Sequence, residues 1–193
     1  MGKNRLEAFS DGVIAIIITI MVLEMKVPHG EDWSALMPLI PVVVSYVLSF
    51  THLGIYWNNH HHMLQAAGHV DGRVLWANLH LLFWLSLIPF VTAWMGENHF
   101  APIPVALYGI DLLASGIAYY ILAHALVAVN GKDSAIAVAL RRDVKGAISP
   151  AIYLAAIIVS FFYAPAALVL YFVVAAIWLV PDRRIERVLR RAE

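Results

Sequence analysis

A stretch near the amino terminus combines polar groups that hydrocarbon cannot satisfy with a long apolar run. In RLEAFSDGVIAIIITIMVLEMKVP, residues 5–28, Asp11 stands at the start of the run and Thr19 interrupts it. An acid inside a bilayer costs about 3 kcal/mol if it faces lipid, so Asp11 should face protein or water and find a partner. Arg5 is six positions away, on another face of a helix. We therefore expect the partner of Asp11 to come from a different segment.

Apolar residues and one hydroxyl share one helical face of this stretch. The face follows the i, i+3, i+4, i+7 spacing of a helix and consists of Phe9, Gly12, Ile16, Thr19, Ile20 and Leu23. One interpretation is a packing seam in which Thr19 donates to the carbonyl four residues earlier. The other is a pore lining, in which apolar rings form a narrow constriction and Thr19 supplies oxygens to a cation.

Composition indicates the elements that position these residues. Of 193 residues, 62% are hydrophobic and 13% are charged, and the mean hydropathy is +0.77, whereas a soluble domain carries about 25% charged residues. A hydrocarbon core of about 30 Å needs roughly 20 apolar residues in a helix. We predict an all-α membrane protein with a single domain, 1–193, and six spans: Arg5–Val27, Leu36–His60, Val74–Met95, Pro102–Val129, Lys145–Tyr163 and Pro165–Val180.

The distribution of Lys and Arg predicts the orientation. With the amino terminus inside, all of the 13 Lys and Arg residues except Lys26 fall on the cytoplasmic side, including Arg141 and Arg142. Cytoplasmic loops carry such an excess, so both termini should be cytoplasmic. The last 12 or so residues form a basic tail suited to anionic lipid.

Asn4 followed by Glu7 resembles a capping box, which predicts that the first helix starts at Arg5.

Histidines and a second acid leave two other functions open. His60, His61 and His62 point about 100° apart on a helix and cannot converge on one metal ion. His52, His80 and His124 lie in separate spans and could ligate haem in an oxidoreductase, but no attachment motif accompanies them.

Asp111 in the fourth span is interfacial or proton-sensitive, depending on its depth, and we expect it to have a structural, hydrogen-bonded role. A proton-coupled secondary transporter would use Asp11, Asp111 and the histidines as a relay. Such a transporter should saturate with a solute.

Catalytic motifs are missing from the sequence. It holds no Gly-x-Ser-x-Gly elbow, paired His–Glu zinc motif or phosphate loop. The absence of cysteine excludes disulfides, thiolate metal sites and cysteine nucleophiles. Ser10 and Asp11 point apart on a helix, so they cannot form a triad with His60. We expect a protein that is not an enzyme and that has no cofactor.

Three segments carry a family resemblance: RLEAFSD at residues 5–11, IYWNNHHH at 55–62 and NLHLLFWLSLIPF at 78–90. They resemble the transmembrane protein 175 family of lysosomal potassium channels and their bacterial relatives. The resemblance implies a cation channel without a Thr-Val-Gly-Tyr-Gly filter loop, whose first helices line the pore. It implies that Ile16 forms the constriction and that Thr19, Ile20 and Leu23 are further pore positions.

The same resemblance implies the roles of the polar residues and the assembly. A network that ties the helices together would comprise Arg5, Phe9, Ser10, Asp11, Trp57 and His60. Animal members carry two six-helix repeats and resemble dimers, so one repeat per chain implies a homotetramer. The implied protein is a potassium-preferring channel in the plasma membrane of a prokaryote, with K⁺ as its permeant ion.

Overall fold

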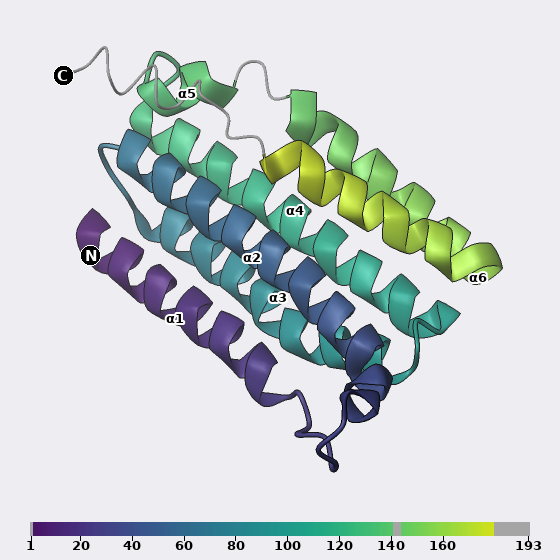
Figure 1. Ribbon diagram of the computed structural model, residues 1–193. Helices are drawn as coiled ribbons and strands as arrows, with labels where there is room; N and C mark the ends of the chain where they lie inside the picture. Colours follow the sequence, from purple (N-terminus) through teal and green to yellow (C-terminus); the bar gives the residue numbers. More distant parts are fainter. Residues whose placement is uncertain (1, 141–143, 180–193) are drawn as a thin grey trace.

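The computed structural model describes residues 2–140 and 144–179, all of whose regular elements are helices (Figure 1). The elements are α1 (Lys3–Leu23), η1 (Trp33–Leu39, a 3₁₀ helix), α2 (Ile40–Ala66), α3 (Gly72–Glu97), α4 (Pro102–Asn130), α5 (Ala135–Leu140) and α6 (Val144–Leu179). Arg141, Arg142 and the basic tail, which the sequence assigns to the cytoplasmic side, lie outside the described residues.

The fifth and sixth predicted spans are two arms of one hairpin, α6. Five helices of the described chain are long and apolar enough to cross a membrane, and α6 is the longest, with 36 residues. Its helical geometry breaks at Tyr163 (φ −154°, ψ 86°), two residues before Pro165. The indole Nε1 of Trp178 donates to Ser149 Oγ at 2.9 Å, so the end of α6 lies beside its beginning. Figure 1 shows the same reversal, in which α6 runs out and back as two helical arms.

The beginnings of the first two helices differ from the prediction. α1 begins at Lys3 behind Gly2, which makes no side-chain cap, so the predicted capping box is wrong: Asn4 already lies in the first turn, and Glu7 contacts α2 instead. α2 begins at Ile40 rather than at Leu36, because residues 33–39 form η1.

Helix α1 lies at one edge of the bundle and α6 at the opposite edge (Figure 1). α1 packs against α2 and α3, whereas α4 packs against α3 and α6. The largest fully buried side chains include Leu81, Leu85, Tyr108 and Leu112 of α3 and α4. The core therefore sits around α3 and α4, and α1 is left with one side uncovered.

Polar contacts define the two ends of the bundle. Lys3 Nζ donates to the carbonyl of Ala67 at 3.0 Å, and Asn130 Oδ1 accepts from the backbone of Gly68 and His69 at 2.8 Å. These contacts join the start of α1, the α2–α3 loop and the end of α4. At the other end, Lys26 Nζ pairs with Glu97 at 2.8 Å. The lysine assigned to the outside thus lies at the end opposite to Lys3.

Candidate functional site

The two faces of α1 have different environments. Its inner face, made of Leu6, Ser10, Ile14, Ile17 and Met21, is buried. The predicted stripe lies on the outer face, where Ile16 is 59% and Leu23 is 79% exposed. Phe9, Gly12, Thr19 and Ile20 are exposed as well. The stripe therefore does not form a packing seam within the chain.

Thr19 donates its hydroxyl proton back to its own helix. Thr19 Oγ1 lies 3.1 Å from the carbonyl oxygen of Ala15 and 2.9 Å from that of Ile16, as expected for a threonine inside a helix. A hydroxyl has one proton and two lone pairs. Because the proton is engaged, the outer face of α1 receives only acceptor lone pairs from Thr19, and these can bind a cation.

A buried hydrogen-bond chain ties the inner face of α1 to α2 and α3. Asn78 Nδ2 donates to Ser10 Oγ at 2.9 Å, and Ser10 Oγ donates to the carbonyl of Leu6 at 2.9 Å. Asn78 Oδ1 lies 2.7 Å from His60 Nε2. Because the amide nitrogen of Asn78 is used on Ser10, its oxygen must accept, and His60 Nε2 carries the proton. Ser10 and His60 thus meet through Asn78, at the start of the resembling stretch NLHLLFWLSLIPF.

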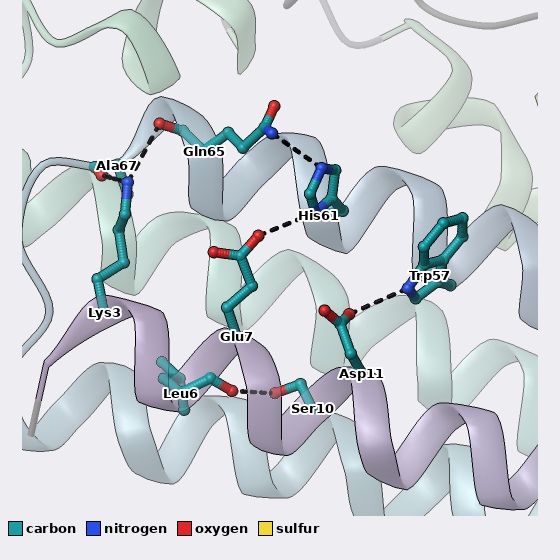
Figure 2. Close-up of polar contacts among 9 residues, drawn as sticks. All are labelled: Lys3, Leu6, Glu7, Ser10, Asp11, Trp57, His61, Gln65 and Ala67. Carbon is teal, nitrogen blue, oxygen red and sulfur yellow. Dashed lines mark hydrogen bonds and ion pairs between the residues drawn. The ribbon is translucent and has the colours of Figure 1, made fainter.

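A second set of contacts joins Glu7 and Asp11 of α1 to α2 (Figure 2). Asp11 Oδ1 accepts from the indole Nε1 of Trp57 at 3.0 Å, so its partner does come from another helix. One turn earlier, Glu7 Oε1 lies 2.9 Å from His61 Nδ1. Gln65 Nε2 lies 2.8 Å from His61 Nε2.

Two members of the implied network do not join it within the chain. Arg5 and Phe9 are exposed on α1. The guanidinium of Arg5 makes no hydrogen bond or ion pair with another described residue, and the side chain of Phe9 has no polar atom. Both lie on the outer side of α1, where Phe9 belongs to the stripe and Arg5 lies one turn before it. The residues that the structure brings together are Ser10 with His60, and Asp11 with Trp57.

Asp111 departs from its expected hydrogen-bonded role. It is buried in α4, and neither of its carboxylate oxygens has a hydrogen-bond partner among the described residues. Ser115 Oγ, one turn along the same face, is also buried and unpartnered, while the hydroxyl of Tyr108, one turn before, accepts from Ser49. Because buried polar groups are normally paired, Asp111 stands out among the buried residues described, and it forms no hydrogen-bonded link between helices.

The other histidines bond within their own helices. His52 Nδ1 lies 3.0 Å from the carbonyl of Leu48, and His124 Nδ1 lies 2.9 Å from that of Tyr120. His80 Nε2 accepts from Trp84 at 3.0 Å. None of these three histidines contacts a second histidine among the described residues.

A cavity lies between α2, α4 and α6, away from the stripe. It has a volume of about 80 Å³ and is enclosed by α2, α4 and α6, with Tyr56, Tyr119, Tyr153 and Trp178 among its walls. No residue of α1 lines it. A passage along the stripe must therefore lie outside the single chain.

Comparison with known proteins agrees with these features. Residues 5–89 match the family described as endosomal/lysosomal potassium channel TMEM175. A potassium channel from Chryseobacterium sp. (strain P1-3) is 54% identical over 190 residues, which are 98% of this chain and 99% of that relative. The human endosomal/lysosomal proton channel TMEM175 is 26% identical over 194 residues, 93% of this chain but 38% of the human protein.

A solved structure has the same fold. The crystal structure of a lysosomal potassium-selective channel TMEM175 homolog from Chamaesiphon minutus matches with a TM-score of 0.79 and 30% sequence identity, over 92% of this chain and 96% of that one. Together with the near full-length relative from Chryseobacterium, this match identifies the chain as a member of the TMEM175 family of ion channels.

Proposed function

We propose that this chain is the subunit of a homotetrameric, potassium-preferring channel that conducts passively through a pore lined by four copies of α1. The observation that supports this most strongly is the outer face of α1, where Ile16, Thr19 and Leu23 lie exposed on a helix whose inner face is fully packed. The relatives from Chryseobacterium and Chamaesiphon are named as potassium channels.

Assembly follows from the geometry of one uncovered helix. A single α1 cannot enclose a passage, but identical helices around a rotation axis can, and closed cyclic symmetry is the usual form of an oligomer. Each stripe residue then appears once per subunit as a ring. The rings of Ile16, Ile20 and Leu23 form the narrow apolar part of the pore.

The Ile16 ring is the proposed constriction. A narrow apolar collar resists wetting, so an ion must shed part of its hydration shell to pass. Potassium is larger and more weakly hydrated than sodium and therefore loses this water more easily. Opening requires the four α1 helices to move apart or rotate until the collar is wide enough to wet.

Thr19 sits one turn beyond the collar and is the proposed ion-facing oxygen. Its proton is already bonded to Ala15 and Ile16, so its lone pairs can replace part of the water that the ion loses at Ile16. The buried link between Ser10, Asn78 and His60 holds the inner face of α1 in place, which keeps the stripe turned outward.

Membrane location and orientation belong to the same proposal. The channel lies in the plasma membrane of a prokaryote with both termini cytoplasmic. The excess of Lys and Arg assigned to one side supports this orientation, as does the position of Lys26 at the end opposite to Lys3.

A planar-bilayer recording under asymmetric potassium and sodium tests the function. We expect current without any co-substrate and a reversal potential close to that of potassium. A membrane containing the purified protein that carries no current, or whose reversal potential follows sodium, contradicts the proposal.

A proton-coupled transporter is the second candidate, and the unpartnered carboxylate of Asp111 favours it. An intramembrane acid of this kind is a common proton carrier in transporters. Transport that saturates with one solute and is abolished by Asp111→Asn would favour this candidate. A potassium current that persists in Asp111→Asn favours the channel.

A further inference from the structure

Three potential metal ligands converge between α1 and α2 near the beginning of the first helix. Glu7 and Asp11 lie one turn apart on α1, and His61 faces them from α2 (Figure 2). One oxygen or nitrogen from each of the three lies within 4.8 Å of the others. We propose that these residues bind a divalent transition-metal ion such as Zn²⁺, which fastens α1 to α2. Its effect on conduction, though not the binding itself, rests on the proposed function.

The distances suit a shared ion. Glu7 Oε1 and His61 Nδ1 are 2.9 Å apart, and two ligands about 2.1 Å from one tetrahedral ion are separated by about 3.4 Å, so these two atoms need to move apart by about 0.5 Å. The ligand atom of Asp11 lies within 4.8 Å of the other two, so it has to move closer by about 1.4 Å at most to reach the tetrahedral separation. Asp11 keeps one oxygen on Trp57, while its other oxygen is directed away from the indole (Figure 2).

The ligand types select the class of metal. Two carboxylates supply negative charge, and the imidazole favours zinc and neighbouring transition metals over Mg²⁺ and Ca²⁺, which prefer oxygen ligands alone. His61 Nδ1 is buried and has Glu7 as its only polar partner among the described residues. It can therefore exchange this contact for a metal ion without losing any other bond.

Gln65 supplies the outer support that a metal-binding histidine needs. It lies 2.8 Å from His61 Nε2. When Nδ1 binds a metal, Nε2 carries the ring proton and requires an acceptor. Rotating the Gln65 amide by half a turn places its oxygen opposite His61 Nε2. The distance stays the same, because the oxygen and nitrogen of an amide occupy equivalent positions.

The site has a direct consequence for the pore helix. Two of its ligands, Glu7 and Asp11, lie on α1, and Asp11 precedes Ile16 by five residues and Ile20 by nine. The third ligand, His61, lies on α2. Opening needs α1 to move relative to its neighbours. An ion that bridges the two helices opposes this movement, so cytoplasmic Zn²⁺ should reduce the potassium flux.

Zn²⁺ binding to the purified full-length protein, prepared without a histidine tag, tests the site. Calorimetry should give micromolar binding of Zn²⁺ and none of Mg²⁺ at the same concentration. Glu7→Gln and His61→Gln preserve size and hydrogen bonding but should each weaken binding at least about tenfold, as expected when a ligand is lost. Glu97→Gln and His124→Ala are the matched controls, and both should bind Zn²⁺ like the wild type. Equal affinity in all five proteins overturns the proposal.

Potassium flux from reconstituted vesicles tests the consequence, with each variant compared with its own metal-free flux. Zn²⁺ should inhibit the wild type and both controls, and inhibition of Glu7→Gln should need at least about tenfold more metal. Inhibition at the same concentration in all variants overturns the regulatory effect. A protein that binds Zn²⁺ at this site yet carries no potassium with or without metal refutes the proposed channel function and leaves the metal site standing.

Discussion

Helices α1 and α6 both expose a long apolar face, but their hydroxyl groups are distributed differently. Ile16 of α1 and Ile158 of α6 are 59% and 60% exposed. In α6 both serines, Ser149 and Ser160, are buried, and the exposed side between them is apolar. In α1 the hydroxyl of Thr19 lies on the exposed side.

This contrast separates two kinds of exposed surface in a membrane protein. A face that meets lipid gains nothing from a serine hydroxyl, and α6 turns both of its serines inward, where Ser149 accepts from Trp178. A face that meets ions needs oxygen atoms, and Thr19 provides them. Exposure alone therefore does not identify a pore face. An exposed hydroxyl does not identify one by itself either, because Ser86 of α3 is also exposed; Thr19 differs in lying on the stripe that the family resemblance assigns to the pore.

The largest expected effect comes from placing a polar group on each of these faces. Ile16→Asn should wet the constriction, raise the potassium current and weaken selectivity; a barrier lower by about 1.4 kcal/mol gives about tenfold more current. Ile158→Asn, which changes an equally exposed isoleucine on α6, should leave the current unchanged. Single-channel recording of both variants checks this. An unchanged conductance in Ile16→Asn, or equal increases in both, contradicts a pore face on α1.

Loss of the Ser10 hydroxyl on the inner face of α1 should lower the stability of the protein. Ser10→Ala removes the acceptor of Asn78 Nδ2 and leaves a buried N–H unpaired, which costs about 1–3 kcal/mol. We expect a lower thermal unfolding midpoint in detergent. A midpoint equal to that of the wild type would mean that the link between Ser10, Asn78 and His60 does not hold α1.

Loss of the Thr19 hydroxyl on the outer face of α1 should instead lower the selectivity for potassium. Thr19→Val keeps the shape of the side chain and removes its oxygen, so stability should change by less than about 0.5 kcal/mol. The preference for potassium over sodium should fall by up to about fivefold, equivalent to about 1 kcal/mol. Reversal potentials measure this ratio. If Thr19→Val has the same potassium-to-sodium ratio as the wild type, Thr19 does not contact the ion.

The smallest expected effect concerns the exposed ion pair at the opposite end of the bundle. Glu97 raises the pKa of Lys26 through their hydrogen bond and charge attraction. A raised lysine pKa stabilises the fold at every pH below the ordinary lysine value and loses this contribution as the pH rises through the folded value. Because Lys26 is fully exposed, Glu97→Gln should not shift the unfolding midpoint measurably at neutral pH. A clear shift would show that this contact matters more than its exposure implies.

The sequence predicts the helices of this protein better than the contacts between them. Hydropathy locates the long apolar helices, five of which in the described chain are long enough to cross a membrane, and it separates the two arms of α6, because length and apolar content depend on local sequence. Periodicity likewise places the stripe on one face of α1, and depth in the bilayer requires a partner for Asp11 on another helix.

Contacts that depend on how helices lie against each other are harder to predict. Asn78 completes the link between Ser10 and His60, and its position opening the resembling stretch in the third span was the available signal. Asp111 was expected to be hydrogen-bonded, yet no described neighbour reaches it. Both outcomes depend on the relative rotation and height of neighbouring helices, which periodicity within one helix does not determine.

Disulfide cross-linking tests the central claim most directly, because the chain contains no cysteine and a single substitution gives an unambiguous signal. Ile16→Cys and Ile158→Cys place one thiol on α1 and one on α6. If four α1 helices surround a narrow axis, mild oxidation should link Ile16→Cys subunits into dimers and reduce the potassium current, while Ile158→Cys stays monomeric on a denaturing gel. Efficient dimers through position 158 and none through position 16 would place the stripe against lipid and contradict the account.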